Sequence, residues 1–265
     1  MHPFITIGVR AVRAAGRTII CALDRLNQVK ITTKGQNDFV TEIDKKAERQ
    51  IIEVIKRAYP HHAILGEESG LAIGTQDYCW IIDPIDGTTN FIHGIPHFAI
   101  SIAVKKGNDI LAGVIFDPNK NELFTAAKGE GARLDQHRIR VNATQKLSNA
   151  LLATGFPFRN HALLPSFLNT FKTLFPRCAG MRRAGSAALD LAYTASGRLD
   201  GFWEADINIW DVAAGVLLVQ EAGGVCSDFQ GSNHYLKTDG PINIIAGTFE
   251  VHQALAKIIQ KSFDL

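Results

Sequence analysis

Apolar residues recur every three or four positions over the first sixty residues, and this spacing predicts two amphipathic helices. The apolar positions of the first helix are Ile5, Val9, Val12, Gly16, Ile19, Leu23 and Leu26. Residues 34–38 read as a turn. The second helix is expected to begin at Thr41, because Asp44 follows three positions later, as in a capping box. Its apolar face consists of Ile43, Ala47, Ile51, Ile55 and Ala58.

The middle of the chain changes to short apolar runs and alternating residues, which predict strands. The predicted strands lie at 63–65, 79–82, 98–104, 110–116 and 123–126, and they indicate an antiparallel meander. Strands and helices then alternate, as in an α/β unit. The predicted helices of this part lie at 163–174, 186–195, 212–222 and 249–259. We therefore expect an α+β half over residues 1–141 and an α/β half over residues 142–265.

Composition narrows the class of protein without identifying it. Of the 265 residues, 46% are apolar and 20% charged, and the net charge of +2 gives no whole-chain sign of nucleic-acid binding. The four cysteines form no C-x-x-C pair, so a zinc site is not expected. Neither a signal peptide nor an apolar run of about 18 residues is evident. We expect a cytoplasmic protein with reduced thiols and no membrane contact.

The segment from Asp83 to Asn90 is the most informative stretch. It follows the apolar run 80–82, places Asp83 and Asp86 three positions apart, and continues with Gly87 and two threonines at a predicted helix start. Mg²⁺ prefers oxygen ligands, and backbone N–H groups at a helix start bind phosphate. One short segment could therefore hold both a metal ion and the phosphate that it activates.

Further carboxylates stand beside predicted strand and helix ends. Glu67 follows one predicted strand, and Asp211 precedes a predicted helix. Carboxylates gathered at such ends suit a pair of Mg²⁺ ions about 3.5–4 Å apart, which would stabilise the attacking and leaving oxygens of a displacement. Each carboxylate alone has a simpler interpretation, because Asp83 or Asp86 can cap a turn, and Asp44 or Asp211 can cap a helix. The spacing by itself leaves both interpretations open.

Motifs along most of the chain occur together in a fixed order. They are W-I-I-D-P-I-D-G-T-T-N-F at 80–91, W-D-V-A-A-G at 210–215 and E-A-G-G at 221–224, with further matches at 38–44, 67–69 and 185–188. This set resembles the inositol monophosphatase family of Mg²⁺-dependent phosphatases. The resemblance implies a layered αβαβα sandwich of the inositol monophosphatase and fructose-1,6-bisphosphatase type. It also implies a homodimer and sensitivity to lithium.

The resemblance assigns a role to each of these positions. The implied metal ligands are Glu67, Asp83, the carbonyl of Ile85, Asp86 and Asp211. Two Mg²⁺ ions would share Asp83 as a bridge, and Asp44 would anchor a water network or a weaker third ion. The implied catalytic residues are Glu67, Thr88 and Asp44, of which Glu67 and Thr88 would orient the attacking water. The implied substrate-binding residues are Asp86, Gly87, Thr88, Gly185, Ser186, Ala187, Glu204 and Asp211.

The implied reaction is hydrolysis of a small phosphorylated polyol, foremost myo-inositol 1-phosphate, by direct attack of a metal-activated water. Fructose 1,6-bisphosphate, histidinol phosphate and a 3′-phosphonucleotide are alternative substrates within the same class. Asp206 departs from the family pattern two positions after Glu204, so we expect an effect on substrate choice. We expect His93 and His97 to have a structural or solvent-facing role, and the Phe156–Phe158 cluster to lie in the core.

A function of another class also follows from the resemblance. The pattern is closest to a bacterial branch of the family whose members are associated with Nus factors and RNA polymerase in ribosomal RNA antitermination. Arg182 and Arg183 offer a contact for such a partner. The sequence is equally consistent with an exposed or ion-paired role for these two residues. A metal site and a separate binding surface can exist in one chain.

Overall fold

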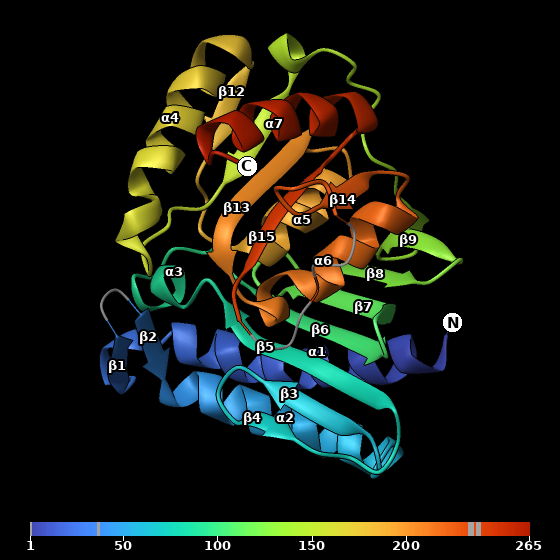
Figure 1. The fold of residues 1–265 in the computed structure, drawn as a ribbon. Coiled ribbons are helices and arrows are strands. Elements are labelled where there is room, and N and C mark those ends of the chain that lie inside the picture. The colour runs from blue at the N-terminus through green and yellow to red at the C-terminus, as the bar shows by residue number, and fades with distance from the viewer. Residues whose placement is uncertain (1, 36–37, 233–235, 237–239) are drawn as a thin grey trace.

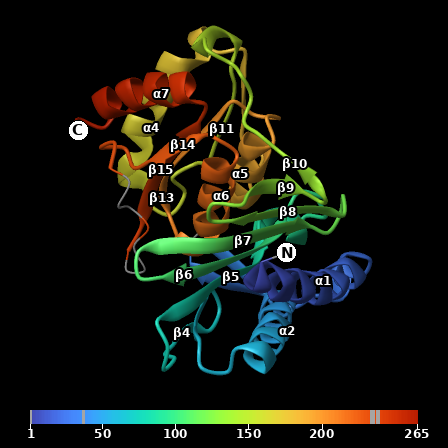
Figure 2. The same ribbon diagram turned by 90° about the vertical axis from the view of Figure 1, so that its right-hand side faces the viewer.

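The computed structural model describes residues 2–35, 38–232, 236 and 240–265, which form five layers (Figure 1). Helices α1 (Pro3–Leu23) and α2 (Glu42–Ala58) form the first layer, on one face of an eight-stranded sheet. Helices α5 (Ala187–Ala195) and α6 (Ile209–Glu221) separate this sheet from a five-stranded sheet. Helices α4 (Leu164–Leu174) and α7 (Phe249–Ser262) cover the far side. The layering confirms the expected αβαβα sandwich (Figure 2).

The two N-terminal helices form where the apolar spacing predicts them. Both bury one apolar face against the eight-stranded sheet. The predicted capping box of α2 is present, since the Thr41 N–H donates to Asp44 Oδ2 at 2.8 Å and Thr41 Oγ1 accepts from the Asp44 N–H at 3.3 Å. This reciprocal pairing satisfies donors that the first helical turn leaves without partners.

The eight-stranded sheet has the order β10-β9-β8-β7-β6-β5-β3-β4. Its strands are β3 (Ala63–Gly66), β4 (Gly70–Ala72), β5 (Tyr78–Asp86), β6 (Ala99–Lys106), β7 (Asp109–Asp117), β8 (Glu122–Ala127), β9 (Gly131–Leu134) and β10 (His137–Arg138). The predicted antiparallel meander is confirmed from β5 to β10, whereas β3 pairs with β5 in parallel. A parallel pair places the ends of β3 and β5 at the same edge of the sheet, which brings Glu67 toward Asp83.

The predicted turn at 34–38 lies largely within a hairpin of β1 (Ile31–Gly35) and β2 (Asp38–Thr41). Its central residues, 36 and 37, are outside the described residues, and so are the side chains of 33–39. The hairpin enters α2 directly at its cap, Thr41.

The five-stranded sheet has the order β12-β11-β13-β15-β14. Its strands are β11 (Leu151–Thr154), β12 (Gly180–Arg182), β13 (Gly201–Ile207), β14 (Val225–Ser227) and β15 (Ile242–Gly247). Strand β11 pairs in parallel with both β12 and β13. The predicted helices of this part are present, but α6 begins at Ile209 rather than at residue 212. The alternative that Asp211 is the N-cap is wrong, because Asn208 is the cap and its N–H donates to Asp211 Oδ2 at 2.9 Å.

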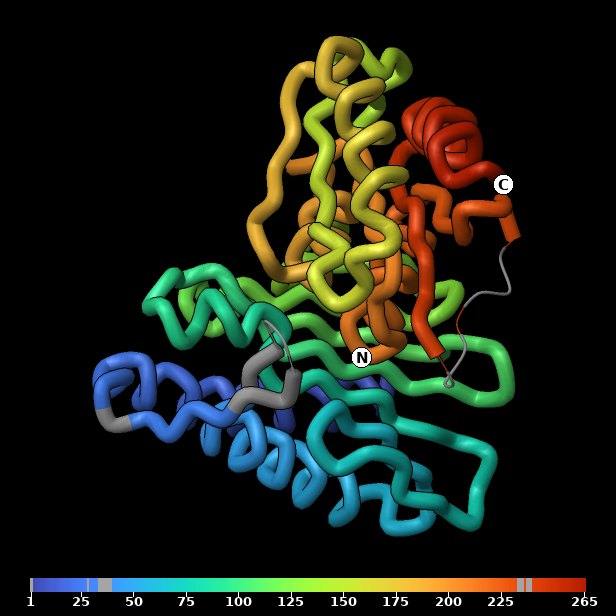
Figure 3. The backbone as a smooth tube through the Cα atoms, turned by 60° about the vertical axis from the view of Figure 1, so that its left-hand side comes forward, coloured from blue at the N-terminus to red at the C-terminus, as the bar shows by residue number. Residues whose placement is uncertain are grey.

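Helix α6 is apolar nearly all round because sheets lie on both of its sides. A Cβ on Gly215 would lie 2.5 Å from the Leu191 Cβ of α5, so these helices pack backbone against side chain. Figure 3 shows the N-terminal part of the chain, blue to green, stacked below the C-terminal part, yellow to red. One apolar cluster contains residues from both sheets, and the boundary at residue 141 remains a prediction. No helix among the described residues is long and apolar enough to cross a membrane.

Candidate functional site

One pocket gathers chain segments from three layers of the fold. Six carboxylates line it, namely Glu67, Asp83, Asp86, Asp190, Glu204 and Asp211. Every predicted site residue lines this pocket except Asp44. Segments as distant in the sequence as residues 67 and 211 therefore share one cavity wall, which no local pattern alone could place.

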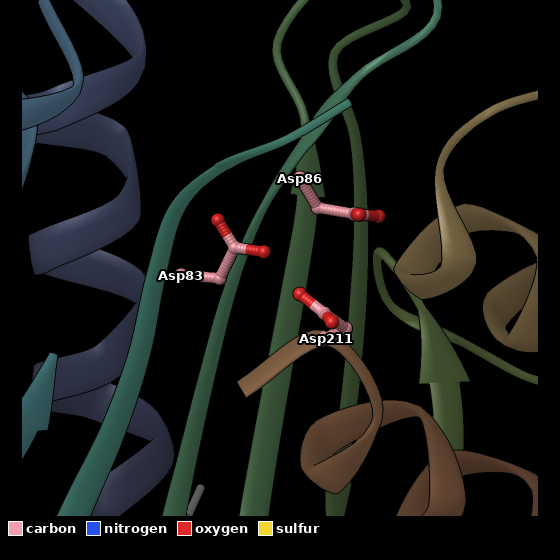
Figure 4. A group of neighbouring side chains, drawn as sticks. All are labelled: Asp83, Asp86 and Asp211. Atoms are coloured by element: carbon pink, nitrogen blue, oxygen red, sulfur yellow. The ribbon is translucent and has the colours of Figure 1, made fainter. Parts of the chain in front are cut away.

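Three of these carboxylates converge closely. Asp83 and Asp86 extend from β5 and Asp211 from the first turn of α6, and one oxygen from each lies within 4.8 Å of the others (Figure 4). The register of β5 against β6 breaks between Asp83 and Asp86. The Ile85 N–H donates to Asp83 Oδ1 at 3.0 Å within this irregular segment. A regular strand places residues three apart on opposite faces, so the break allows both side chains to reach one point.

Burial without a cation is electrostatically costly for this group. Burial raises the pKa of Asp83 well above its ordinary value, and the charges of Glu67, Asp86 and Asp211 raise it further. Burial and the charge of Asp211 likewise raise the pKa of Asp86 to about 7. Oxygen donors that repel one another at buried positions are suited to a hard divalent cation. The donor set therefore fits Mg²⁺.

Asp86 is also held from the opposite side by α5. The Ser186 hydroxyl and the Ala188 N–H both donate to Asp86 Oδ2, the latter at 2.8 Å. Ser186 also caps α5, because its Oγ accepts from the Leu189 N–H at 3.3 Å. The predicted metal and substrate sets are thus physically connected through Asp86.

Asp44 lies behind the pocket wall instead of on it. It is fully buried, and burial raises its pKa to about 6 although hydrogen bonds from Thr41 and Thr88 oppose this rise. Thr88 Oγ1 lies 3.2 Å from Asp44 Oδ1 and 3.0 Å from the Ile85 carbonyl oxygen. The helix-capping interpretation of Asp44 is confirmed, and the same side chain can orient the Thr88 hydroxyl. Its predicted contact with a third ion remains untested.

The predicted phosphate-binding turn lies where the two halves of the site meet. Gly87 has φ +97° and precedes α3 (Thr88–Ile92), and its conformation favours glycine. A Cβ there would lie 3.0 Å from the Gly185 carbonyl oxygen. Asn90 of α3 joins the two segments, because its Nδ2 donates to the His97 carbonyl at 2.7 Å and the Ala184 carbonyl at 2.9 Å.

Glu204 completes the pocket from β13. A Cβ on Gly155 would collide with the Glu204 carboxylate, so glycine is required beside it. Burial raises the pKa of Glu204 well above its ordinary value, and the charges of Asp190, Asp211 and Asp86 add to this rise. Its carboxylate can accept hydrogen bonds from substrate hydroxyls, which is the role that the sequence predicts.

The sequence prediction omitted pocket residues on the wall formed by the five-stranded sheet. The sequence motifs do not indicate Asp190 or Arg159, and they indicate Arg183 only as a partner contact. Asp190 could have been found, because it follows the predicted cap Ser186 by four residues and so lies on the same side of α5. Arg159 and Arg183 follow adjacent parallel strands, a relation that only the sheet order reveals.

Two expectations about neighbouring residues need correction. Asp206 does not line the carboxylate pocket, and instead it lines an adjacent cavity with Trp210 and accepts φ +61° at a register break in β13. A direct effect on substrate choice is therefore not supported. Phe156 is not a core residue, because 48% of it is exposed. His97 packs edge-on against Tyr193, in keeping with its expected structural role.

Known proteins resemble this chain in both sequence and structure. The curated Nus factor SuhB of Pseudomonas aeruginosa is 48% identical over an alignment of 265 positions, which covers 98% of this chain and 97% of that protein. The structure of the extragenic suppressor protein suhB from Bartonella henselae has a TM-score of 0.93 at 40% identity and covers 98% and 99% of the two chains. The inositol monophosphate-bound structure of SaIMPase-II has a TM-score of 0.81 at 28% identity, covering 98% and 95%.

The fold and the carboxylate pocket define a phosphatase-fold protein of the layered αβαβα type. The sequence model of the inositol monophosphatase family matches residues 1–263. This chain therefore belongs to the inositol monophosphatase family, and the family resemblance noted from its motifs is confirmed.

Proposed function

We propose that this protein is a Mg²⁺-dependent hydrolase of phosphate monoesters, and that its substrate is myo-inositol 1-phosphate. The observation that carries the proposal is the convergence of Asp83, Asp86 and Asp211 in a buried pocket with Glu67 on the same wall. The family of the chain and the inositol monophosphate bound to one relative support the choice of substrate.

The carboxylates Glu67, Asp83, Asp86 and Asp211, with the Ile85 carbonyl, would hold Mg²⁺. When bound, Mg²⁺ lowers the pKa of water and neutralises charge that develops on the leaving oxygen. Glu67 and Thr88 line the pocket together, so they can orient one water molecule toward the phosphorus. Asp44 fixes the Thr88 hydroxyl from behind.

The reaction exchanges one bond at phosphorus. The water oxygen forms a bond to phosphorus, the bond from phosphorus to the polyol oxygen breaks, and the polyol leaves after it takes up a proton. The backbone N–H groups of Gly87 and Thr88 would hold the phosphate, and Ser186, Ala187 and Glu204 would bind the polyol. Asp86 links these two groups of residues through the Ser186 and Ala188 hydrogen bonds. No side-chain nucleophile is needed.

Asp83→Asn tests the proposal directly. We expect wild-type protein to release phosphate from myo-inositol 1-phosphate with Mg²⁺, and the variant to lose at least roughly a hundredfold in rate because an amide is a poorer cation ligand. Asp206→Asn, a carboxylate outside the pocket, is the matched control and should retain activity. Equal rates for wild type and Asp83→Asn would contradict the mechanism.

The similarity to Nus factor SuhB supports a second proposed function. We propose that the chain also binds Nus factors or RNA polymerase in antitermination, through a surface separate from the pocket. Retention of this protein on immobilised NusA or RNA polymerase at low salt tests this binding, and no retention would contradict it. Asp83→Asn should bind as well as wild type, because the metal site is internal.

A homodimer is expected and is measured by light scattering.

A further inference from the structure

Asp190 is a pocket residue to which the proposed mechanism gives no role. It lies in the first turn of α5 and lines the carboxylate pocket together with Glu204 and Ser186. The Asp190 N–H donates to the Ser186 carbonyl at 3.0 Å, so Asp190 lies one helical turn beyond Ser186 on the same side of α5. Asp190 thus belongs to the wall that the proposed mechanism assigns to the polyol.

The Asp190 carboxylate is buried without a hydrogen-bond donor. Only 3% of the residue is exposed, and within the described residues its side chain has no hydrogen bond and no ion pair within 4.0 Å. Fully enclosed polar atoms without a partner occur elsewhere in the described part of the chain, and the Asp190 oxygens are not among them. These oxygens therefore meet the open space of the pocket. Because a buried carboxylate without a donor costs free energy, a ligand that supplies a donor is favoured there.

Glu204 is the neighbouring acceptor on this wall. Burial raises the pKa of Glu204, and the charge of Asp190 raises it further, with a larger effect than the charge of Asp211 or Asp86. Asp190 is therefore the carboxylate that acts most strongly on Glu204. Two neighbouring carboxylates offer acceptors to two hydroxyl groups at once. A polyol ring carries hydroxyls on adjacent carbons and can supply both donors.

We propose that Asp190 is a further substrate-binding residue, which accepts a hydrogen bond from a polyol hydroxyl next to the one bound by Glu204. This inference rests on the proposed hydrolase function and adds a specificity-determining contact to it. An acceptor that binds a substrate hydroxyl rejects analogues without this hydroxyl, because the buried acceptor then stays without a donor. Asp190 would thus select polyol phosphates over phosphates of apolar alcohols of the same size.

The competing explanation gives Asp190 a structural role. A negative charge in the first turn of a helix interacts favourably with the helix dipole. Burial and the charge of Asp86 raise the pKa of Asp190, and the positive charge of Arg183 opposes this rise. If Asp190 only stabilises α5 and the preceding loop, a change at this position alters the hydrolysis of all substrates equally.

The test compares myo-inositol 1-phosphate with cyclohexyl phosphate, which has the same carbon ring and no hydroxyl group. We expect Asp190→Ala to lower kcat/KM for myo-inositol 1-phosphate about tenfold, as the loss of one charge-assisted hydrogen bond does, and not to lower it for cyclohexyl phosphate. Asp190→Asn keeps a neutral acceptor and should lie between Asp190→Ala and the wild type. Asp206→Asn, a change to a carboxylate in the adjacent cavity, is the matched control and should keep the wild-type ratio.

Binding of myo-inositol is measured in parallel by NMR titration, because this product carries no phosphate and its binding to Asp190 requires neither Mg²⁺ nor turnover. Its Kd should rise about tenfold in Asp190→Ala and remain unchanged in Asp206→Asn. The melting temperature without ligand shows whether each variant folds. Asp190→Asn, which conserves the size of the side chain, replaces the alanine variant if that variant does not fold, and should show a smaller rise in Kd.

The outcomes separate the two proposals. If Asp190→Ala lowers kcat/KM equally for both esters, or leaves the Kd of myo-inositol unchanged, the substrate contact is overturned and the hydrolase function stands. Undetectable binding of myo-inositol to the wild type would overturn the contact as well. If the wild type hydrolyses no phosphate ester, the proposed function fails, whereas a higher Kd of myo-inositol in Asp190→Ala would still support the contact between Asp190 and the polyol.

Discussion

His62 is a buried side chain whose protonation state is fixed by its neighbours. Only 4% of it is exposed, and its ring is stacked between Tyr59 and Tyr78 at centre distances of 4.6 and 4.8 Å. Its Nδ1 accepts a hydrogen bond from Trp80 Nε1 at 3.0 Å, so this nitrogen carries no proton. Burial lowers the pKa of His62 below its ordinary value. A neutral imidazole therefore belongs to the folded state.

This environment predicts a loss of stability in mild acid. The unfolded chain protonates His62 below its ordinary pKa of 6.5, whereas His62 in the folded chain stays neutral to a lower pH. The free energy of unfolding therefore falls as the pH decreases. His62→Phe keeps the stacking but leaves the Trp80 N–H without an acceptor, which should cost roughly 1–3 kcal/mol at pH 7.5. The variant should nevertheless show a shallower fall in stability between pH 7 and 5.

Urea unfolding at several pH values measures both effects. Some slope should remain in His62→Phe, because burial also lowers the pKa values of His97 and His252. The exposed His93, changed to Phe, is the control and should keep the wild-type slope. An unchanged slope in His62→Phe would show that this side chain is not the titrating group.

Short elements position the site through side chains that join separate segments. Asn90 of α3 donates to the carbonyl groups of His97 and Ala184, and thus connects the segment after β5 with the loop before α5. That loop leads into Ser186, whose hydroxyl donates to Asp86. A change at Asn90 should therefore disturb the loop that carries Ser186 more than the carboxylates of Asp83, Asp86 and Asp211.

Asn90→Asp removes both donors while conserving the size of the side chain. We expect KM for myo-inositol 1-phosphate to rise about tenfold, because the His97 and Ala184 carbonyls both lose their donor. The Kd of Mg²⁺ should change much less, since the hydrogen bonds of the Asn90 side chain go to the His97 and Ala184 carbonyls. Steady-state kinetics and calorimetry measure the two quantities. Asn108→Asp, in the exposed turn after β6, is the control. If Asn90→Asp weakened Mg²⁺ binding as much as it raised KM, a positioning role of Asn90 would be contradicted.

At the scale of the whole molecule, the pocket ties the layers together electrostatically. Asp83 and Asp86 belong to the eight-stranded sheet, Asp211 to the helical layer between the sheets, and Glu204 to the five-stranded sheet. Burial raises the pKa values of Asp83, Asp86 and Glu204, and the repulsion between these carboxylates across the layers raises them further. A cation bound among them would offset this repulsion in the folded state only.

Mg²⁺ should therefore raise the melting temperature of the wild type. At a hundredfold excess over Kd the gain is about 2.7 kcal/mol, which corresponds to roughly 5–10 °C for a chain of this size. The shift in melting temperature should shrink as the pH falls below about 7, because protons compete with Mg²⁺ for the Asp86 carboxylate. Calorimetric melting with and without EDTA measures it. NaCl at matched ionic strength is the control, and an undiminished shift in Asp83→Asn would refute metal binding at this site.

The amino-acid sequence alone determined the local elements and the family. Helical spacing, the Thr41 cap and the strand alternation depend on neighbours within one element, so they were predictable from nearby residues. The motifs around Asp83 and Asp211 also indicated the family. The exact start of α6 was not predicted, because the hydrogen bond between Asn208 and Asp211 outweighs the apolar spacing there.

Only the tertiary structure decided which distant residues share the pocket. It placed Asp190, Arg159 and Arg183 on its wall and Asp206 outside it. The parallel pairing of β11 with β12 and the break in β5 produce these positions, and both depend on contacts between residues far apart in the sequence. Charge repulsion among carboxylates arises only after such contacts form. The sequence therefore identified the family and its candidate metal-binding residues, whereas packing determined the electrostatics and the shape of the pocket.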